Sequence, residues 1–247
     1  IDPWPGGWWR LRDLVDYELT LSLSLVKTAW LHKEDFLFNS YQMYRHSIGT
    51  TDKGQPYAYV IPPDQHDYPA ALDMVRILML GGVEVERAGG QFVADGKVYP
   101  AGSFVVRLGQ PYKPYAWALL SRQKYPDLRQ YPGGPPVPPY DNAGWTLPLQ
   151  MGVTCDEVAA PFEAELDRLE AAPAVPAAPA VPEAARLVLD CRTNAAYGAV
   201  FALLKEKAEV RRSREPVRTA GFEAAAGSFI VKNSPEVRRA LPGILKA

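Results

Sequence analysis

The apolar and polar positions of the chain follow the same order twice. In residues 57–106, and again in 185–231, a short apolar strand precedes a helix, a second strand, a turn and a third strand. The first of these helices is expected to start after Asp67 and to stop at Gly81 and Gly82. Because strand, helix and strand in succession are typical of parallel sheets with helical crossovers, the pattern predicts an α/β fold with a mostly parallel sheet flanked by helices.

The third strand of each copy carries nearly the same phrase, "PAGSFVVR" at 100–107 and "AAGSFIVK" at 225–232. Aligning 83–107 with 208–232 without a gap gives nine identical residues in twenty-five positions. This similarity indicates an internal duplication of one structural unit. The shared Gly-Ser-Phe core contains no acid, base or metal ligand, and the apolar run after it suits a strand covered on both faces. We therefore interpret the repeated phrase as structural.

A helical segment precedes the two copies. Apolar residues recur at helical spacing from Leu11 to Trp30, which predicts an amphipathic helix that breaks near His32 and then resumes. An apolar stripe on a helix must be covered by other residues. We expect this stripe to lie against the α/β body. The stripe includes Leu14, Leu19, Leu23 and Val26.

These patterns predict the domain organisation. Residues 1–50 form the helical segment, and residues 51–247 form the duplicated α/β domain. Its first half covers about 57–170 and its second half about 186–247, and we expect the strands of both halves to share one sheet. Between the halves, the alternating Ala and Pro residues of 171–185 predict a semi-rigid extended tether.

Composition argues against two classes of partner. With 27 Lys and Arg against 28 Asp and Glu, the formal net charge is −1, which provides no electrostatic case for nucleic acid. No run of about 18 apolar residues is present that could span a membrane. The two cysteines, Cys155 and Cys191, are interpreted as small core residues. The chain starts without Met, and we expect the natural polypeptide to continue at both ends.

Motifs for catalysis or metal binding are not found in the sequence. The three histidines lack a partner at metal-ligand spacing, and no H-x-x-E, C-x-x-C or G-x-S-x-G motif occurs. We therefore assign no catalytic residue, no metal ligand and no cofactor to this chain.

One polar cluster follows the first strand of each copy. In open α/β sheets, ligands bind beyond the carboxyl ends of the strands and beside helix N-termini. The candidates for such a crevice are Asp64, Gln65, His66, Arg192 and Asn194. The alternative interpretation is that the same residues cap helices and terminate strands.

Several phrases point to a known family, among them "WPGGWWRLRDLVDYEL", "PYAYVIPPDQ" and "YPGGPPVPPYDNAGWTLPLQMGV". Together with the duplicated second part, they make nearly the whole chain resemble the C-terminal portion of large bacterial zinc carboxypeptidases. These are carboxypeptidase A-like metallopeptidases with an appended domain. The resemblance implies a flavodoxin-like, class I glutamine amidotransferase-like fold for that domain. It also implies that residues 1–50 end the peptidase catalytic domain, that zinc belongs to the parent protein, and that the protein is periplasmic or secreted.

The resemblance does not extend to either active site. The zinc ligands of the peptidase family match no residue of this chain, and Cys191 does not stand in the position of the amidotransferase nucleophile. The leading interpretation is a non-catalytic accessory domain of a zinc metallocarboxypeptidase. It would pack on the upstream catalytic domain, and the parent would hydrolyse peptide or amide bonds with zinc-activated water. One alternative is a domain that binds a small molecule or peptide in the crevice. The other is a pure assembly module that uses the Tyr-, Trp- and Pro-rich loop at 125–146.

Overall fold

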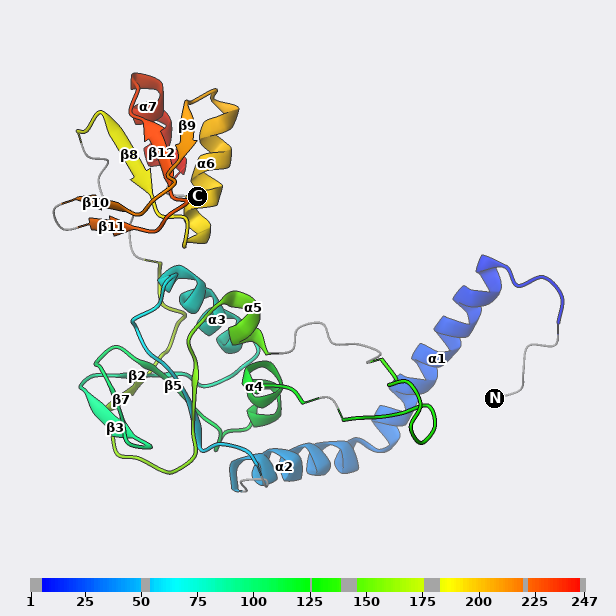
Figure 1. Ribbon diagram of the computed structural model, residues 1–247. Helices are drawn as coiled ribbons and strands as arrows, with labels where there is room; N and C mark the ends of the chain where they lie inside the picture. The colour runs from blue at the N-terminus through cyan, green and yellow to red at the C-terminus, as the bar shows by residue number, and fades with distance from the viewer. Residues whose placement is uncertain are drawn as a thin grey trace.

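The chain folds into a helical arm and two α/β lobes, each lobe with its own sheet (Figure 1). The computed structural model describes residues 6–49, 54–124, 126–138, 146–175, 183–219 and 222–244. We call 54–175 the first lobe and 183–244 the second lobe. The tether prediction falls partly on 176–182, which lie outside the described residues, as do 125 and 139–145 of the aromatic loop.

The first lobe is built around a five-stranded sheet with the order β6-β1-β5-β2-β7. Every neighbouring pair in this sheet is antiparallel. A two-stranded hairpin, β3 with β4, lies apart from it. The elements of this lobe are β1 (Ala58–Ile61), α3 (Tyr68–Leu80), β2 (Glu86–Ala88), β3 (Phe92–Ala94), β4 (Lys97–Tyr99), β5 (Phe104–Arg107), α4 (Lys113–Leu120), α5 (Leu147–Met151), β6 (Asp156–Val158) and β7 (Leu166–Arg168).

The second lobe contains a smaller, three-stranded sheet with the order β8-β12-β9, again antiparallel at each pairing. Its hairpin is formed by β10 and β11. The elements are β8 (Arg186–Leu189), α6 (Asn194–Lys205), β9 (Val210–Arg212), β10 (Val217–Thr219), β11 (Phe222–Ala224), β12 (Phe229–Lys232) and α7 (Pro235–Ile244).

The expectation of a mostly parallel, flavodoxin-like sheet is wrong. Within the described residues, all strand pairs of both lobes are antiparallel. The strand–helix–strand order is present, but the third strand of each copy inserts between the first two and runs opposite to both. The first two strands therefore share a direction without being neighbours. This arrangement is a split βαβ unit rather than a crossover between adjacent parallel strands.

The expectation that both halves share one sheet is also wrong. The strand β5 belongs to the first sheet and β12 to the second. The hydrophobic clusters follow the same division, because each of them draws its residues from one lobe. The duplicated unit has therefore formed two separate cores.

The two copies nevertheless match in local detail at the end of their helices. In the first lobe, the Val83 N–H donates to the Leu78 carbonyl at 3.0 Å. In the second lobe, 125 residues further along, the Ala208 N–H donates to the Leu203 carbonyl at the same distance. Leu78 and Leu203 are both fully buried. The same helix ending thus leads into the second strand of each copy.

The repeated phrase enters the central strand of each sheet. Gly102 and Gly227 have φ angles of +84° and +90°, a backbone region that L residues with a Cβ atom rarely occupy. The serines that follow them, Ser103 and Ser228, are completely buried. The next four residues form β5 or β12, which has a partner strand on each side. A glycine turn before a doubly covered strand explains why this phrase is written twice.

The helical arm consists of α1 (Leu11–Leu31) and α2 (Lys33–Gly49), which meet at His32. At its start, the Arg10 N–H donates to the Asp13 carboxylate at 2.9 Å, and Asp13 also suits the positive end of the helix dipole. The arm contacts the first lobe through α2 and α4, where the rings of Tyr44 and Tyr112 lie 5.9 Å apart. Figure 1 shows α1 directed away from both lobes.

The expectation that the stripe of α1 lies buried on the α/β body is wrong, since none of the residues of α1 is buried. A helix of 21 residues is about 30 Å long. The far end of α2 contacts α4 of the first lobe, and α1 points away from the sheet of that lobe (Figure 1).

The buried phenol of Tyr99 makes the first lobe sensitive to alkaline pH. Tyr99 stacks on Phe92 at 5.2 Å between ring centroids and is 2% exposed. Its burial, together with the neighbouring Asp156 carboxylate, raises the pKa of Tyr99 to about 12. Since the folded pKa lies above the unfolded value of about 10, this contribution to stability is complete below pH 10 and is lost as the pH rises toward 12.

We expect the free energy of unfolding of the native chain to fall by up to about 2 kcal/mol more than that of Tyr99→Phe between pH 9 and about 12. Urea titrations of both proteins across this range measure the difference. Parallel curves for the two proteins would show that folding does not raise the pKa of Tyr99.

Candidate functional site

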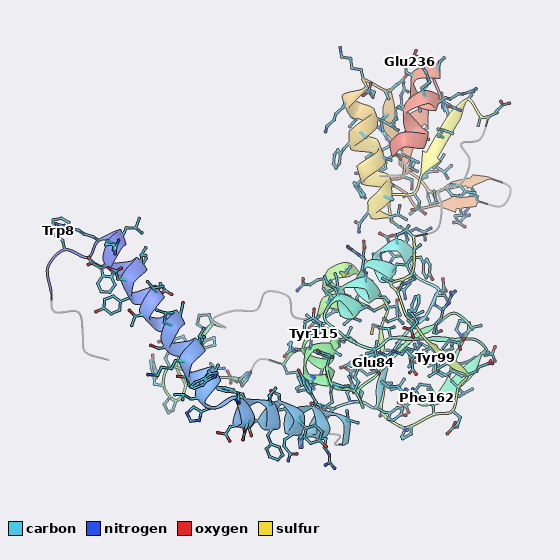
Figure 2. The ribbon with its side chains drawn as sticks, turned by 180° about the vertical axis from the view of Figure 1, so that it is seen from behind. Trp8, Glu84, Tyr99, Tyr115, Phe162 and Glu236 are labelled. Atoms are coloured by element: carbon cyan, nitrogen blue, oxygen red, sulfur yellow. The ribbon has the colours of Figure 1, made fainter. Side chains whose placement is uncertain are left out.

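Among the elements that the structure describes, α1 carries the most exposed large apolar side chains. The exposed fractions are 77% for Leu11, 66% for Leu25 and 68% for Trp30. Figure 2 shows side chains standing out along this helix. The other large apolar residues of α1 that are exposed are Leu14, Val15, Tyr17, Leu19, Leu21, Leu23, Val26 and Leu31. A surface of this size usually marks a site of contact with another protein or domain.

Five of the nine charged, serine and threonine residues of α1 lie in one stripe, and the other four, Arg12, Glu18, Ser22 and Thr28, lie outside it. Asp13, Asp16, Thr20, Ser24 and Lys27 follow each other at spacings of three or four residues, so they share one side of the helix. The apolar residues occupy most of the remaining circumference. A helix that is apolar on most sides is typical of a helix surrounded by its neighbours, rather than one resting on a flat surface.

The polar cluster after the first strands lies where the two lobes meet. The Asn194 N–H, at the start of α6, donates to Oδ2 of Asp67 at 2.9 Å. Asp67 is also the N-cap residue of α3, so this carboxylate stands beside the positive ends of two helices. It is 4% exposed, and its Oδ1 has no hydrogen-bond partner within the described structure. Asp67 was expected to cap α3, but its side chain bonds across the lobes instead.

Gln65 is engaged in holding two loops of the first lobe together. Its Oε1 accepts from the Thr154 N–H at 2.8 Å, and its Nε2 donates to the carbonyls of Thr154 and Pro62 at 3.0 and 2.7 Å. The exposed His66 lies beside Gly152, where an added Cβ would come within 3.0 Å of its imidazole. Asp64 is exposed. In this cluster, Gln65 has a structural role and the other two side chains face the surface.

Arg192 bonds within its own loop. Its Nε and Nη2 donate to the Asp190 carboxylate at 3.0 and 2.6 Å, and this pairing holds the pKa of Asp190 below its usual range. Of the predicted crevice residues, Asn194 takes part in the hydrogen bond between the lobes, through its backbone N–H, and the other four do not. Asp67, which accepts that bond, was not among the candidates. Its position between a strand end and a helix start was visible in the sequence, but its bond to the other copy was not.

A groove of about 710 Å³ lies in the first lobe between α4, α5 and β6. Its lining carries Arg122 and Lys124, opposite in charge to Asp156 and Glu157, together with Cys155. Burial raises the pKa of the Cys155 thiol, so this sulfur is protonated at neutral pH and is a poor nucleophile. The groove was not expected from the sequence, because it is formed by elements that are far apart along the chain.

No group of three or more His, Cys, Asp or Glu side chains that could hold a metal ion occurs within the described residues. They therefore do not fit the zinc centre that the family resemblance places in the parent protein. Among the helices that the structure describes, none is both long enough and apolar enough to cross a membrane.

Comparison with known proteins adds no relative. No family model matches the chain, and neither the curated proteins nor the solved structures yield a match.

Proposed function

We propose that this chain is a non-catalytic accessory module of a zinc metallocarboxypeptidase, and that α1 packs into the peptidase catalytic domain. The observation that supports the proposal most directly is the exposed apolar surface of α1. The phrases that resemble the C-terminal portion of such enzymes begin at this helix and continue through the first lobe.

The distribution of residues on α1 favours a catalytic domain as its partner. Burial of one leucine side chain contributes about 1.5–3 kcal/mol, so leaving this many large apolar side chains in water is costly. Because they surround most of the helix, the partner must enclose α1 rather than touch one side of it. The interior of a folded domain does this. In this proposal α1 belongs to the core of the peptidase domain, and α2 connects that domain to the first lobe.

The coding sequence that precedes the codon for Ile1 provides the direct test. We expect it to encode a carboxypeptidase A-like domain with an H-x-x-E motif. The longer polypeptide should bind about one zinc ion and hydrolyse peptide substrates in a chelator-sensitive reaction. The 247-residue chain alone should do neither. Stoichiometric zinc and chelator-sensitive hydrolysis by the chain alone would contradict the proposal, and so would an upstream sequence without those ligands.

The role of α1 is tested by paired double substitutions in the longer polypeptide. Leu19→Glu with Leu23→Glu should destabilise the catalytic domain by more than about 3 kcal/mol, because two buried leucines become charged. Thr20→Glu with Ser24→Glu is the matched control, since it introduces the same charges on the polar stripe of the same helix. The control should cost less than about 1 kcal/mol. Equal effects of the two pairs on thermal unfolding would show that α1 is not enclosed.

A further inference from the structure

The two copies differ at the edges of their sheets. In the first lobe, the outer strands of the shared unit are each covered by an additional strand, β6 on β1 and β7 on β2. In the second lobe, the corresponding strands β8 and β9 each pair with β12 alone within the described residues. The edge strand β2 of the first lobe is therefore paired with a further strand, and its equivalent in the second lobe, β9, is unpaired on that side within the described residues.

The backbone groups at the open edge of β9 can be identified from the first lobe. There, the Gly89 N–H donates to the Glu165 carbonyl at 3.0 Å, and the Leu169 N–H donates to the Val85 carbonyl at 2.9 Å. The residues 125 positions after Val85 and Gly89 are Val210 and Arg214. On the side that faces the central strand, both copies have the same register. The Ser213 N–H donates to the Ser228 carbonyl, as the Ala88 N–H donates to the Ser103 carbonyl. Since the bonding direction alternates along a strand, the N–H and C=O groups of Val210, Arg212 and Arg214 point to the open side.

The side chains of β9 indicate the charge of the segment that would fit. On the covered edge, Glu86 lies opposite Arg168, and Arg87 lies opposite Asp167, so residues of opposite charge face each other at both positions. Arg168 forms its ion pair with Glu84, and Glu86 forms one with Arg107. On β9 the equivalent positions are Arg211 and Arg212. Opposite charges on facing strands are stabilising and like charges are destabilising. An incoming strand should therefore carry carboxylates opposite both arginines.

Both arginines are available for such pairing. The Arg211 side chain is 75% exposed, and its ion pair with Glu209 is a surface pair of small energetic value. Two contacts hold the Arg212 side chain in place. Its guanidinium lies 5.2 Å from the Phe229 ring centroid, and its Nε donates to the Gly227 carbonyl at 2.8 Å. Arg87 has the same position over Phe104 in the first lobe, where β7 covers the edge.

We infer that the edge of β9 binds an extended acidic segment of a partner protein, which adds as an antiparallel strand in the way that β7 adds to β2. Main-chain hydrogen bonds would provide the pairing and the arginines would select for acidic residues. A second copy of the chain fits poorly, because antiparallel pairing of β9 with itself would place arginines opposite arginines. Charged residues on an edge often serve to prevent pairing. In the first lobe, however, a charged edge is paired by a strand of complementary charge.

The probe for this inference is a capped eight-residue peptide, EAELDELE, which is the sequence of 163–170 with Arg168→Glu. It is titrated into the complete isotope-labelled chain at low ionic strength, and binding is followed by amide NMR shifts and hydrogen exchange. We expect shifts centred on β9 and slower exchange of the Arg212 and Arg214 amides. Shifts spread over other basic surfaces, or the absence of binding, would overturn the inference.

Two controls separate strand addition from simple charge attraction. The same peptide with methylated backbone nitrogens at the positions of Asp167 and Leu169 keeps its charge but loses two donors, and it should bind about tenfold more weakly. The variant Arg211→Glu should reverse the preference, so that the peptide EAELDRLE binds about fivefold more tightly than EAELDELE. Equal binding of the methylated peptide would overturn the inference. Sedimentation showing dimers that Arg211→Glu changes would also overturn it, in favour of a second copy as the occupant.

Discussion

Replacing Phe104 with alanine is expected to lower the stability of the first lobe by about 4 kcal/mol and to leave the second lobe unchanged. Phe104 is 1% exposed and lies in β5, between Ile61 of β1 and Arg87 of β2. Its removal leaves a cavity that strands on both sides prevent from collapsing. Because the cores of the two lobes share no residue, we expect two unfolding transitions, of which only one is shifted.

The matched variant is Phe229→Ala, at the equivalent position of β12. It should shift the other transition by about 3 kcal/mol, somewhat less because Phe229 is 7% exposed. The two transitions can be assigned by their signals, since residues 183–247 contain no tryptophan. Tryptophan fluorescence then reports the arm and the first lobe, while far-ultraviolet circular dichroism reports both lobes. If both variants shift one common transition, the lobes unfold as a single cooperative unit and the division drawn from the sheets is wrong.

Replacing Gln110 with methionine is expected to destabilise the first lobe by about 3 kcal/mol, although the volume of the side chain hardly changes. Gln110 is 4% exposed, and its side-chain amide bonds both the backbone N–H and the backbone carbonyl of Glu84. Its Oε1 accepts from the Glu84 N–H at 2.7 Å, and its Nε2 donates to the Glu84 carbonyl at 3.1 Å. The same Nε2 donates to the Arg107 carbonyl at 2.6 Å. Methionine fills the space and leaves these backbone groups unpaired.

Hydrogen exchange at the Glu84 amide distinguishes this cause from a general loss of packing. The amide should be protected in the native chain and should exchange faster in Gln110→Met, under conditions where the centre of β5 remains protected. The variant Gln110→Glu retains the acceptor for the Glu84 N–H but loses both donors, so the amide should keep part of its protection. Unchanged unfolding of Gln110→Met, with a protected Glu84 amide, would show that other groups or water satisfy this site.

The elements that could be predicted from the sequence are those whose causes lie within a few residues. The start of α3 after Asp67 and its end at Gly81 follow from turn and helix preferences of neighbouring residues. The break between α1 and α2 at His32 was visible in the same way. The strand β7 was not predicted, because its three residues, Leu166–Arg168, have no apolar pattern of their own. These residues form a strand because their backbone N–H and C=O groups pair with those of β2.

The loops of the candidate site could be predicted from neighbouring residues, but their hydrogen-bond partners could not. The loops after β1 and β8 were expected to be polar and to precede helices, and they do so. Which groups they would bond was decided by the other copy of the unit. Asp67 accepts from Asn194, 127 residues away, and no pattern within either loop indicates this partner. The exposed surface of α1 illustrates the same limit, since the helical spacing of its leucines shows that they need a partner and does not name it.

The sequence by itself determined that one unit is written twice and where its helices and central strands lie, because these depend on side chains close together in the chain. The tertiary structure alone decided the order and direction of the strands, the separation into two sheets, and the open edge of β9. The physical reason is that strands pair through backbone N–H and C=O groups, which every residue except proline carries. A strand of three or four residues covered on both faces therefore does not specify its neighbour, and only the packing of the whole chain selects it.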